Sequence, residues 1–347
     1  MYIRTIDWKN NKVRLIDQTK LPEKLIYIDI DNLKDLWQAI KIMQVRGAPA
    51  LGAAAALGMY LGIKDYKGAN GLGFKDKLNA VAKYISSSRP TARNLFYGIE
   101  RVQAVVLKNK NSSVNKIKQI ILLEAKKIMQ EDMFSCRKIG AQGAKLLKDK
   151  SRVLTICNAG ILATIDYGTA LGVIYAAKEQ GKDIKVYSCE TRPLLQGARL
   201  SSWELNKQGV DVTMIADNTA ATLLTQGKID IVITGADRIA ANGDVANKIG
   251  TFNLAILCSH HKIPFYVAAP FSTFDLKIKN GKGVEIEMRK SEEVTKILLK
   301  KNVAPAGAKV LNPAFDVTPQ ELISGLITDK GIICKPYINN IRNILEK

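Results

Sequence analysis

The sequence predicts an α/β protein in which a C-terminal parallel sheet flanked by helices follows a mainly helical N-terminal domain with a small antiparallel sheet. Three observations predict this fold class. Short β-branched apolar runs alternate with helical stretches after residue 152, helical periodicity dominates the part before it, and β-like runs occupy the first 30 residues. Because 347 residues are many for one core, we expect two domains, residues 1–130 and 131–347.

The first 30 residues hold three β-like runs, at 3–8, 13–16 and 25–30. The Asn10-Asn11 pair between the first two runs is typical of a hairpin turn. Asp31 is a suitable N-cap for a helix that we expect to continue to residue 45, because apolar side chains recur on one face of it.

A glycine-containing turn leads into the next expected helix, residues 51–63. Arg46, Gly47 and Ala48 lie in this turn, and Gly47 lets the backbone approach a ligand closely. Pro49 suits the first helical turn. An arginine beside a helix N-terminus is a suitable anion site. The alternative is that the small residues only permit close helix packing, which explains the alanines of the helix but not Arg46.

A second arginine, Arg89, precedes another expected helix at residues 92–107. Taken alone, this motif is more often a cap and a turn than a binding site. We expect one further helix at residues 113–147, broken near Asp132. These helices complete the predicted N-terminal domain.

The alternation of strands and helices after residue 152 is the pattern of a Rossmann-like parallel sheet. We expect its strands at 153–156, 184–188, 212–215, 229–234 and 265–268. Polar residues follow these strands, among them Cys157, Asp217 and Asp237. Ligands of open α/β sheets bind at the carboxyl ends of the strands, so these residues predict a site at that edge.

The fourth of these strands organises the candidate site. After it come Gly235, Asp237 and a polar loop at 242–244, and then Asn247 and Lys248, with which we expect an amphipathic helix to begin. This unit brings a carboxylate, an amide and an ammonium group close together. The alternative is a solvated loop in which Asp237 caps a turn, and this stretch alone favours neither interpretation.

The motifs that are missing argue against cofactors and metals. The turn after the first expected strand has one glycine in place of a G-x-G-x-x-G pattern, so we do not expect NAD or FAD. The chain has no Walker A, H-E-x-x-H or G-x-S-x-G motif. His260 and His261 are the only histidines, and the five cysteines lack C-x-x-C spacing. We therefore expect neither histidine-based catalysis nor a metal site.

The chain is strongly basic, with 52 Lys and Arg against 32 Asp and Glu and a formal net charge of +20. The positive charges are interleaved with acids, so we expect a solvated surface and no nucleic-acid partner. The N-terminus has no apolar signal core, and the most apolar segment, 48–63, is shorter than the roughly 18 residues of a membrane span. With unbridged thiols as well, we expect a cytoplasmic protein without membrane contact.

Cys157 and Asp237 are the candidate catalytic residues. A thiol near a helix N-terminus can act as a base or nucleophile, although a single cysteine is more often a small buried apolar residue. A carboxylic acid that keeps its proton can act as a general acid. Arg46, Arg89 and Lys248 provide positive charge for a phosphate. This set of groups indicates relocation of a proton or hydride on a sugar phosphate.

Seven stretches of the chain resemble the methylthioribose-1-phosphate isomerase family: VRGAPALG (45–52), SRPTARNL (88–95), CNAGILAT (157–164), ETRPLLQGARLSSWEL (190–205), ITGADRIAANGDVANKIGT (233–251), VAAPFSTFD (267–275) and NPAFDVTP (312–319). The same superfamily includes ribose-1,5-bisphosphate isomerases and the regulatory subunits of the eukaryotic translation-initiation exchange factor. Ile156 stands where the family commonly has histidine and Leu194 where it has arginine, and segment 283–287 lacks a usual proline. These departures bear on fine substrate preference.

The resemblance implies an aldose–ketose isomerase that converts 5-methylthioribose 1-phosphate to 5-methylthioribulose 1-phosphate in methionine salvage, as a homodimer without a cofactor. It implies that Asp237 is the proton donor and that Cys157 assists at the transition state. It also implies substrate contacts from Arg46, Gly47, Ala48, Arg89, Gln196, Asn247 and Lys248.

Two alternatives remain on the same fold. One is an isomerase of a related sugar phosphate, 5-deoxyribose 1-phosphate or ribose 1,5-bisphosphate. The other is a non-catalytic regulatory subunit, against which the presence of both Cys157 and Asp237 argues.

Overall fold

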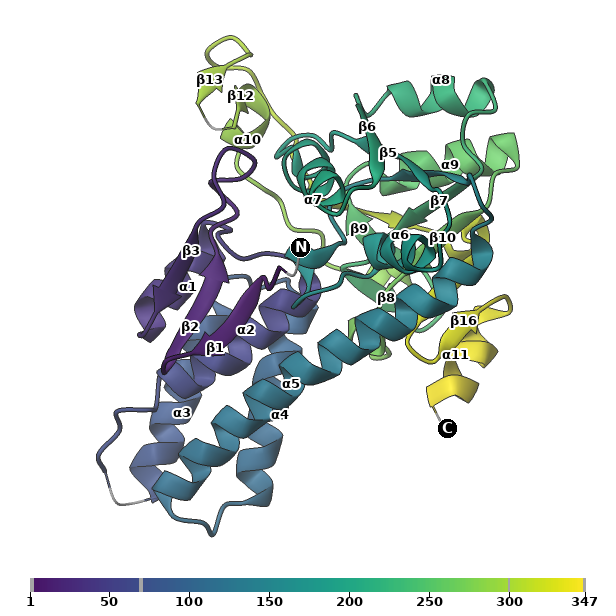
Figure 1. Ribbon diagram of the computed structural model, residues 1–347. Coiled ribbons are helices and arrows are strands. Elements are labelled where there is room, and N and C mark those ends of the chain that lie inside the picture. Colours follow the sequence, from purple (N-terminus) through teal and green to yellow (C-terminus); the bar gives the residue numbers. More distant parts are fainter. Residues whose placement is uncertain (1–2, 69–70, 299, 346–347) are drawn as a thin grey trace. The chain divides into compact units, whose positions relative to one another are not determined.

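The computed structural model describes residues 3–68, 71–298 and 300–345, which form two compact units (Figure 1). Of these residues, the N-terminal unit contains those up to Phe134 together with Ile161–Asp166, and the C-terminal unit contains Ser135–Gly160 together with those from Tyr167 onwards. The short segment Ile161–Asp166 therefore packs with the N-terminal unit, although it follows the first strand of the C-terminal sheet. The expected domain boundary at residue 130 stays a prediction.

Three strands form an antiparallel sheet in the N-terminal unit: β1 (Ile6–Lys9), β2 (Lys12–Ile16) and β3 (Tyr27–Ile30). Asn10 and Asn11 join the first two strands with φ angles of 51° and 58°. Positive φ at both central residues is the requirement of a type I′ hairpin turn. The expected small antiparallel sheet and its hairpin are therefore confirmed.

The helices of the N-terminal unit are α1 (Leu33–Lys41), α2 (Ala48–Leu61), α3 (Gly71–Ser86), α4 (Arg93–Lys108) and the first part of α5 (Val114–Gly143). Helix α2 is the core helix, because its residues are buried around almost the whole circumference. A Cβ added at Gly98 of α4 would lie only 2.2 Å from the carbonyl oxygen of Gly52 in α2. The small residues of α2 thus allow close helix packing.

Two details of these helices differ from the sequence-based expectation. Asn32, and not Asp31, caps α1, since its side-chain oxygen accepts the N–H of Asp35 at 2.9 Å. Helix α5 continues through Asp132 instead of breaking there. The Asp132 carboxylate accepts the backbone N–H of Ile165 at 2.8 Å, so it makes a tertiary contact that the local sequence does not reveal.

The C-terminal unit is built on a seven-stranded sheet with the order β16-β15-β10-β7-β4-β5-β6. The five strands expected from the sequence are present and parallel, as β4 (Arg152–Thr155), β5 (Lys185–Cys189), β6 (Asp211–Ile215), β7 (Ile231–Thr234) and β10 (Phe265–Ala268). The sequence analysis missed two more strands, β15 (Gly325–Thr328) and β16 (Gly331–Ile333). β15 pairs in parallel with β10, and β16 pairs with β15 in an antiparallel hairpin at the end of the sheet.

Helices follow most of these strands: α6 (Ala170–Glu179), α7 (Ser202–Lys207), α8 (Thr219–Thr225), α9 (Thr251–His261) and α11 (Tyr337–Leu345). Apolar side chains of α8, α9 and α11 form one buried cluster with those of the sheet. A π-helical turn, Gly197–Ser201, leads directly into α7. The α/β class with a mostly parallel sheet is confirmed.

A second, four-stranded sheet of the C-terminal unit has the order β11-β8-β9-β14, with β8 (Arg238–Ala240), β9 (Val245–Lys248), β11 (Phe274–Asp275) and β14 (Phe315–Thr318). The expectation of a helix beginning at Asn247 and Lys248 is wrong, because both residues lie on β9 and α9 begins at Thr251. β9 pairs with β14, a partner almost seventy residues later in the sequence, so local patterns do not indicate it.

The remaining elements are short. They are α10 (Glu292–Thr295), the hairpin of β12 (Lys296–Ile297) and β13 (Lys301–Asn302), and 3₁₀ turns at Ala144–Leu146, Ile161–Ala163, Phe271–Thr273, Gly281–Gly283 and Gln320–Leu322.

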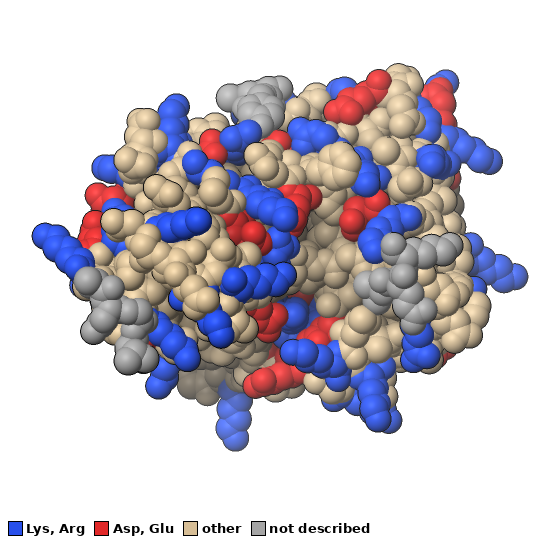
Figure 2. Space-filling model, turned by 90° about the horizontal axis from the view of Figure 1, so that it is seen from below, with Lys and Arg blue, Asp and Glu red and all other residues tan. Residues whose placement is uncertain are grey.

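The described surface carries mixed charge. In the view of Figure 2, Lys and Arg side chains stand among Asp, Glu and other residues and do not gather in one patch. None of the helices in the described part of the chain combines the length and the apolar character that a membrane span requires.

Candidate functional site

The loops that carry Cys157 and Asp237 leave two neighbouring strands of the large sheet. Strands β4 and β7 pair in parallel, with Val153 opposite Ile231, so their carboxyl ends meet at the same edge. The loops touch just beyond the strands, since a Cβ added at Gly235 would lie 2.6 Å from the Cβ of Ala159. Only a glycine fits at position 235, and the absence of its side chain keeps the two loops together.

The backbone of Cys157 is fixed by hydrogen bonds to side chains. Cys157 is half-buried and has a φ of 65°, a left-handed conformation that is unusual for a residue with a side chain. Its N–H donates to Thr191 Oγ1 at 2.8 Å, and its carbonyl accepts from Ser201 Oγ at 2.6 Å. The loop after Cys157 contains a 3₁₀ turn at Ile161–Ala163, and the α-helix that follows, α6, begins only at Ala170. Hydrogen bonds, and not the N-terminus of an α-helix, therefore hold this cysteine.

The loop after β5 is fixed by a carboxylate from the next strand. Asp217, beyond the end of β6, accepts the backbone N–H groups of Thr191 and Arg192, each at 2.7 Å. Thr191 Oγ1 donates in turn to the carbonyl of Cys189 at 3.0 Å. The carboxyl ends of β4, β5 and β6 are thus connected through Thr191.

Gln196 lies in this loop, directly before the π-helical turn, and is 5% exposed. No donor of the described residues lies within hydrogen-bonding distance of its Oε1. A buried amide oxygen without a donor is unfavourable, so this atom is available to a donor from outside the chain. π-Helical turns occur frequently at functional sites.

Asn247 and the Asp237 loop are joined to each other by β9. The Asn247 amide nitrogen donates to Thr234 Oγ1 at 2.9 Å and to Thr251 Oγ1 at 3.0 Å. The N–H of Asp237 donates to the carbonyl of Ala246 at 2.9 Å. Because both amide hydrogens of Asn247 are used, a substrate contact from this side chain falls to its Oδ1.

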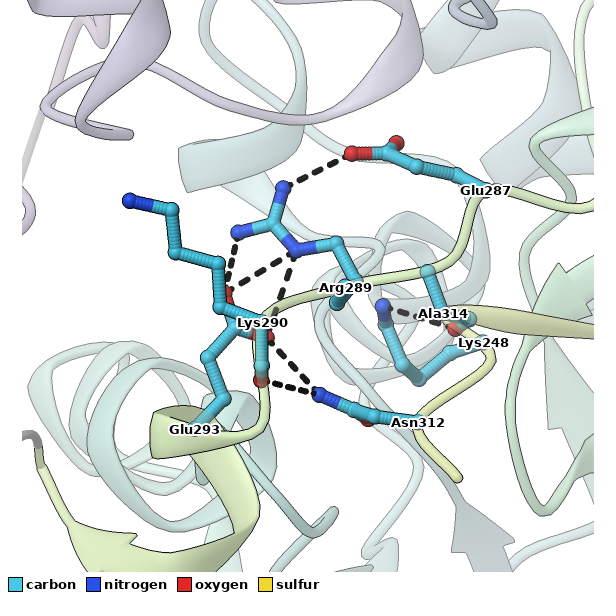
Figure 3. Close-up of polar contacts among 7 residues, drawn as sticks. All are labelled: Lys248, Glu287, Arg289, Lys290, Glu293, Asn312 and Ala314. Carbon is cyan, nitrogen blue, oxygen red and sulfur yellow. Dashed lines mark hydrogen bonds and ion pairs between the residues drawn. The ribbon is translucent and has the colours of Figure 1, made fainter. Parts of the chain in front are cut away.

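Lys248 is held at the end of β9 (Figure 3). Its Nζ donates to the carbonyl of Ala314 at 3.0 Å and lies 4.6 Å from the centre of the Phe315 ring. The segment that carries Ala314 runs beside the segment that carries Glu287, since the N–H of Ala314 donates to the carbonyl of Glu287 at 2.9 Å. Arg289 stabilises this arrangement through ion pairs with Glu287 and Glu293.

A carboxylate of the chain occupies the N-terminus of α9. Asp316 accepts the N–H of Gly250 at 2.7 Å and the N–H of Phe252 at 3.1 Å. Burial raises the pKa of Asp316 to about 6, although these two hydrogen bonds and Lys248 act in the opposite direction. This helix terminus is therefore filled from within and is not an open anion site.

The ionisation of Asp316 should make the unfolding free energy fall as the pH rises from about 4 to about 6. In this window the folded state binds more protons than the unfolded state, because the folded pKa lies above the ordinary value of 3.8. The contribution is fully present below the window and lost above it, and each unit of displaced pKa corresponds to about 1.4 kcal/mol. Urea unfolding of the wild type and of Asp316→Asn across this range measures it. We expect the unfolding free energy of the wild type minus that of the variant to fall over this range. A value that stays constant or rises with pH would contradict the prediction.

The other predicted contact residues lie in the N-terminal unit. Gly47 is the N-cap of α2 with a φ of 94°, and a Cβ there would lie 2.4 Å from the Cα of Ala163. Pro49 stands in the first turn of α2, as expected. Arg46 is buried beside this helix start, with 8% of its surface exposed, and half-buried Arg89 lies in the turn that leads to α4. Ala48 is the first residue of α2.

The described ranges of the chain contain no group of three or more His, Cys, Asp and Glu side chains placed to hold a metal ion.

A model of the family described as the initiation factor 2 subunit family matches residues 44–335 of this sequence. The chain belongs to the initiation factor 2 subunit family. Among its relatives, a 5-deoxyribose 1-phosphate isomerase of Moorella thermoacetica is 51% identical, covering 99% of this chain and 97% of that protein. A methylthioribose-1-phosphate isomerase of Geotalea uraniireducens is 50% identical over the full length of both.

A solved structure of the same kind is similar throughout. The crystal structure of 5-methylthioribose 1-phosphate isomerase from Pyrococcus horikoshii OT3 matches with a TM-score of 0.90 and 41% identity, covering 99% of this chain and 96% of that one.

In this member of the initiation factor 2 subunit family, the C-terminal unit holds five of the nine predicted site residues: Cys157, Gln196, Asp237, Asn247 and Lys248. The sequence analysis did not find the residues that hold them in place, such as Thr191 and Ser201. Thr191 and Asp217 had a visible signal, because each follows an expected strand, yet nothing in the sequence connects the Asp217 carboxylate to the loop after β5.

Proposed function

We propose that this protein is an aldose–ketose isomerase that converts 5-methylthioribose 1-phosphate to 5-methylthioribulose 1-phosphate. The observation that carries the proposal is the meeting of the Cys157 and Asp237 loops at the carboxyl edge of β4 and β7, where Gly235 packs on Ala159. Relatives that share about half of their residues with this chain over its whole length carry the names of such isomerases, which supports the proposal.

The substrate chemistry requires an acid. A sugar with phosphate on its anomeric oxygen cannot open spontaneously to a free aldehyde, so its ring oxygen must receive a proton while the bond from C1 to that oxygen breaks. Asp237 supplies this proton. Hydrogen then moves from C2 to C1, and the 2-hydroxyl loses its proton as the ketone forms. One proton is delivered and one is recovered, so no co-reactant is needed.

Cys157 acts beside C2 and C1 in this scheme. In the route through an enediol its thiolate removes the proton from C2, and in the hydride-shift route its polarisable sulfur stabilises the cationic transition state. Turnover in deuterium oxide separates the routes, because an enediol takes up deuterium at C1 whereas a hydride shift does not.

The remaining groups bind the substrate. Gln196 Oε1 accepts from a sugar hydroxyl, which gives this buried oxygen its hydrogen bond. Asn247 Oδ1 and the Lys248 ammonium act from β9. From the N-terminal unit, Arg46 and Arg89 with the turn Gly47-Ala48 at the start of α2 provide charge and N–H donors for the phosphate.

Turnover by the purified protein tests the proposal. We expect 5-methylthioribose 1-phosphate to yield a ketose phosphate that is detected by carbon NMR. The name of the Moorella relative makes 5-deoxyribose 1-phosphate the second substrate to test. The kcat/KM values for the two sugars decide which one this protein prefers. No ketose from either sugar at micromolar enzyme would refute the proposed function. We place the reaction in methionine salvage and in the cytoplasm, where the five unbridged cysteines would stay reduced.

We also propose that two copies pair through the edge of the large sheet. β6 ends the strand order, so its outer edge pairs with no other described strand, and an open edge normally needs cover. Met214 of β6 is 55% exposed and Ile256 of α9 is 46% exposed. Ile256 also lines an apolar cavity of about 680 Å³ together with Leu311, which is 81% exposed.

Replacing Ile256 with lysine should convert the dimer to a monomer. A buried ammonium without a partner is unfavourable enough to outweigh the apolar contacts of such an interface. Light scattering at micromolar concentration should give twice 38.2 kDa for the wild type and 38.2 kDa for the variant. Leu107→Lys, at a 71% exposed position of α4, is the matched control and should stay dimeric. A monomeric wild type would contradict the proposal.

A further inference from the structure

A fully buried carboxylate lies against the Cys157 loop and takes no part in the proposed chemistry. Glu204 of α7 has no exposed surface. Its Oε2 accepts from the Asn158 side-chain nitrogen at 3.1 Å, and its Oε1 accepts from the Tyr175 hydroxyl at 2.8 Å. Burial and the neighbouring Glu204 raise the pKa of Tyr175 well above its ordinary value, so the phenol remains a donor. A carboxylate removed from water depends on such hydrogen bonds.

Asn158 connects this carboxylate to the backbone of Cys157. The Asn158 nitrogen that donates to Glu204 also donates to Ser201 Oγ at 3.1 Å. Ser201 Oγ in turn donates to the carbonyl of Cys157 at 2.6 Å. The left-handed φ of Cys157 costs free energy, so the conformation that aims the thiol depends on the hydrogen bonds that hold its peptide groups.

The same carboxylate also shapes the other end of the loop. A Cβ added at Gly160 would lie 1.5 Å from Glu204 Oε1, so the carboxylate occupies the space of a side chain at that position. Residues 157–160 therefore wrap around Glu204, with the Asn158 side chain on one oxygen and the Gly160 backbone close to the other.

We propose that Glu204 is a positioning residue, which orients the Cys157 thiol through Asn158 and Ser201. Its effect on turnover rests on the proposed function. The orientation of the thiol, however, is measurable without a substrate, as the rate at which Cys157 reacts with iodoacetamide.

The variant Glu204→Gln keeps the volume but replaces the charged carboxylate by a neutral amide, which weakens the hydrogen bond from Asn158 when its oxygen faces Asn158 and removes it when its NH₂ group does. We expect kcat to fall by about 10- to 100-fold with KM within about threefold, as for a misplaced catalytic group. The alkylation rate of Cys157 should change by about tenfold, and its pH profile should shift. These rates are measured in a Cys334→Ser background, because Cys334 is the exposed cysteine.

Tyr175→Phe is the matched control, since it removes a different donor to the same carboxylate and leaves the contact with Asn158 in place. It should keep kcat within about threefold of the wild type. If Glu204→Gln does not fold, Ser201→Ala decides, because it removes the hydroxyl between Asn158 and Cys157 without disturbing the buried carboxylate.

The outcomes separate the two proposals. A Glu204→Gln protein with a lower melting temperature but unchanged kcat and alkylation would show a purely structural role and overturn the inference. In the case where only Ser201→Ala folds, unchanged rates in that variant would overturn it equally. A wild type that isomerises neither sugar phosphate, with alkylation still altered by Glu204→Gln, would refute the proposed function and support the positioning role.

Discussion

Replacing Asp237 with asparagine should lower kcat by about 10²- to 10⁴-fold, the range that general acid catalysis contributes. An amide cannot deliver a proton to the ring oxygen, so the bond from that oxygen to C1 would have to break without acid assistance. The backbone of Asp237 is held by the carbonyl of Ala246, and this contact does not involve the carboxylate. Asparagine also matches aspartate in size, so we expect the variant to fold.

Steady-state kinetics with 5-methylthioribose 1-phosphate measures this loss, and a thermal melt checks the fold. Asp183→Asn, at an exposed position between α6 and β5, is the control for removing one carboxylate from the same unit and should be fully active. An Asp237→Asn protein with near-wild-type kcat and a native melt would exclude Asp237 as the acid.

Replacing Cys157 with serine should lower kcat by about 10²-fold, through the loss of a base or of a polarisable group at the reacting carbons. The change nearly conserves volume and leaves the backbone hydrogen bonds to Thr191 and Ser201 in place. A cysteine that only fills space would lose little activity on this change. Cys334→Ser, at the exposed cysteine, is the control and should be neutral.

Alkylation provides an independent measurement of the same role. Iodoacetamide should inactivate the Cys334→Ser protein by reaction at half-buried Cys157, because the other three cysteines are buried. Saturating ketose product should protect against this inactivation. Full activity of Cys157→Ser beside the control, or inactivation that product does not slow, would leave Cys157 as a packing residue.

The parts of the fold that follow local rules were predictable from the sequence. The parallel strands read as β-branched runs, and the first hairpin shows in Asn10-Asn11, because asparagine tolerates positive φ. The pairing of β9 with β14 was not predictable, since its partner lies almost seventy residues away. This pairing makes strand residues of Asn247 and Lys248, which the local pattern assigns to a helix. Asp132 misled in the same way, because its carboxylate makes a tertiary contact.

In the candidate site, too, some residues were predictable from the sequence and others were not. Cys157 and Asp237 could be found because both follow buried parallel strands, and the carboxyl ends of such strands meet. The residues that hold Cys157 and Asp237 in place could not be identified from the sequence. The connection from Asp217 through Thr191 to Cys157 depends on side chains that are far apart in the sequence and on left-handed φ angles, and composition reveals neither.

The contact between Gly235 and Ala159 limits which positions can be varied when the enzyme is altered by directed evolution. A Cβ at Gly235 would lie 2.6 Å from the Cβ of Ala159, so a library that varies Gly235 would mostly yield proteins in which the Cys157 and Asp237 loops are forced apart. The same holds for Gly160, whose missing side chain gives its place to Glu204. Diversity is better introduced at half-buried Leu194, one of the positions where the resemblance implies a different residue. Selection could then act on substrate choice while Gly235 and Gly160 keep their close contacts.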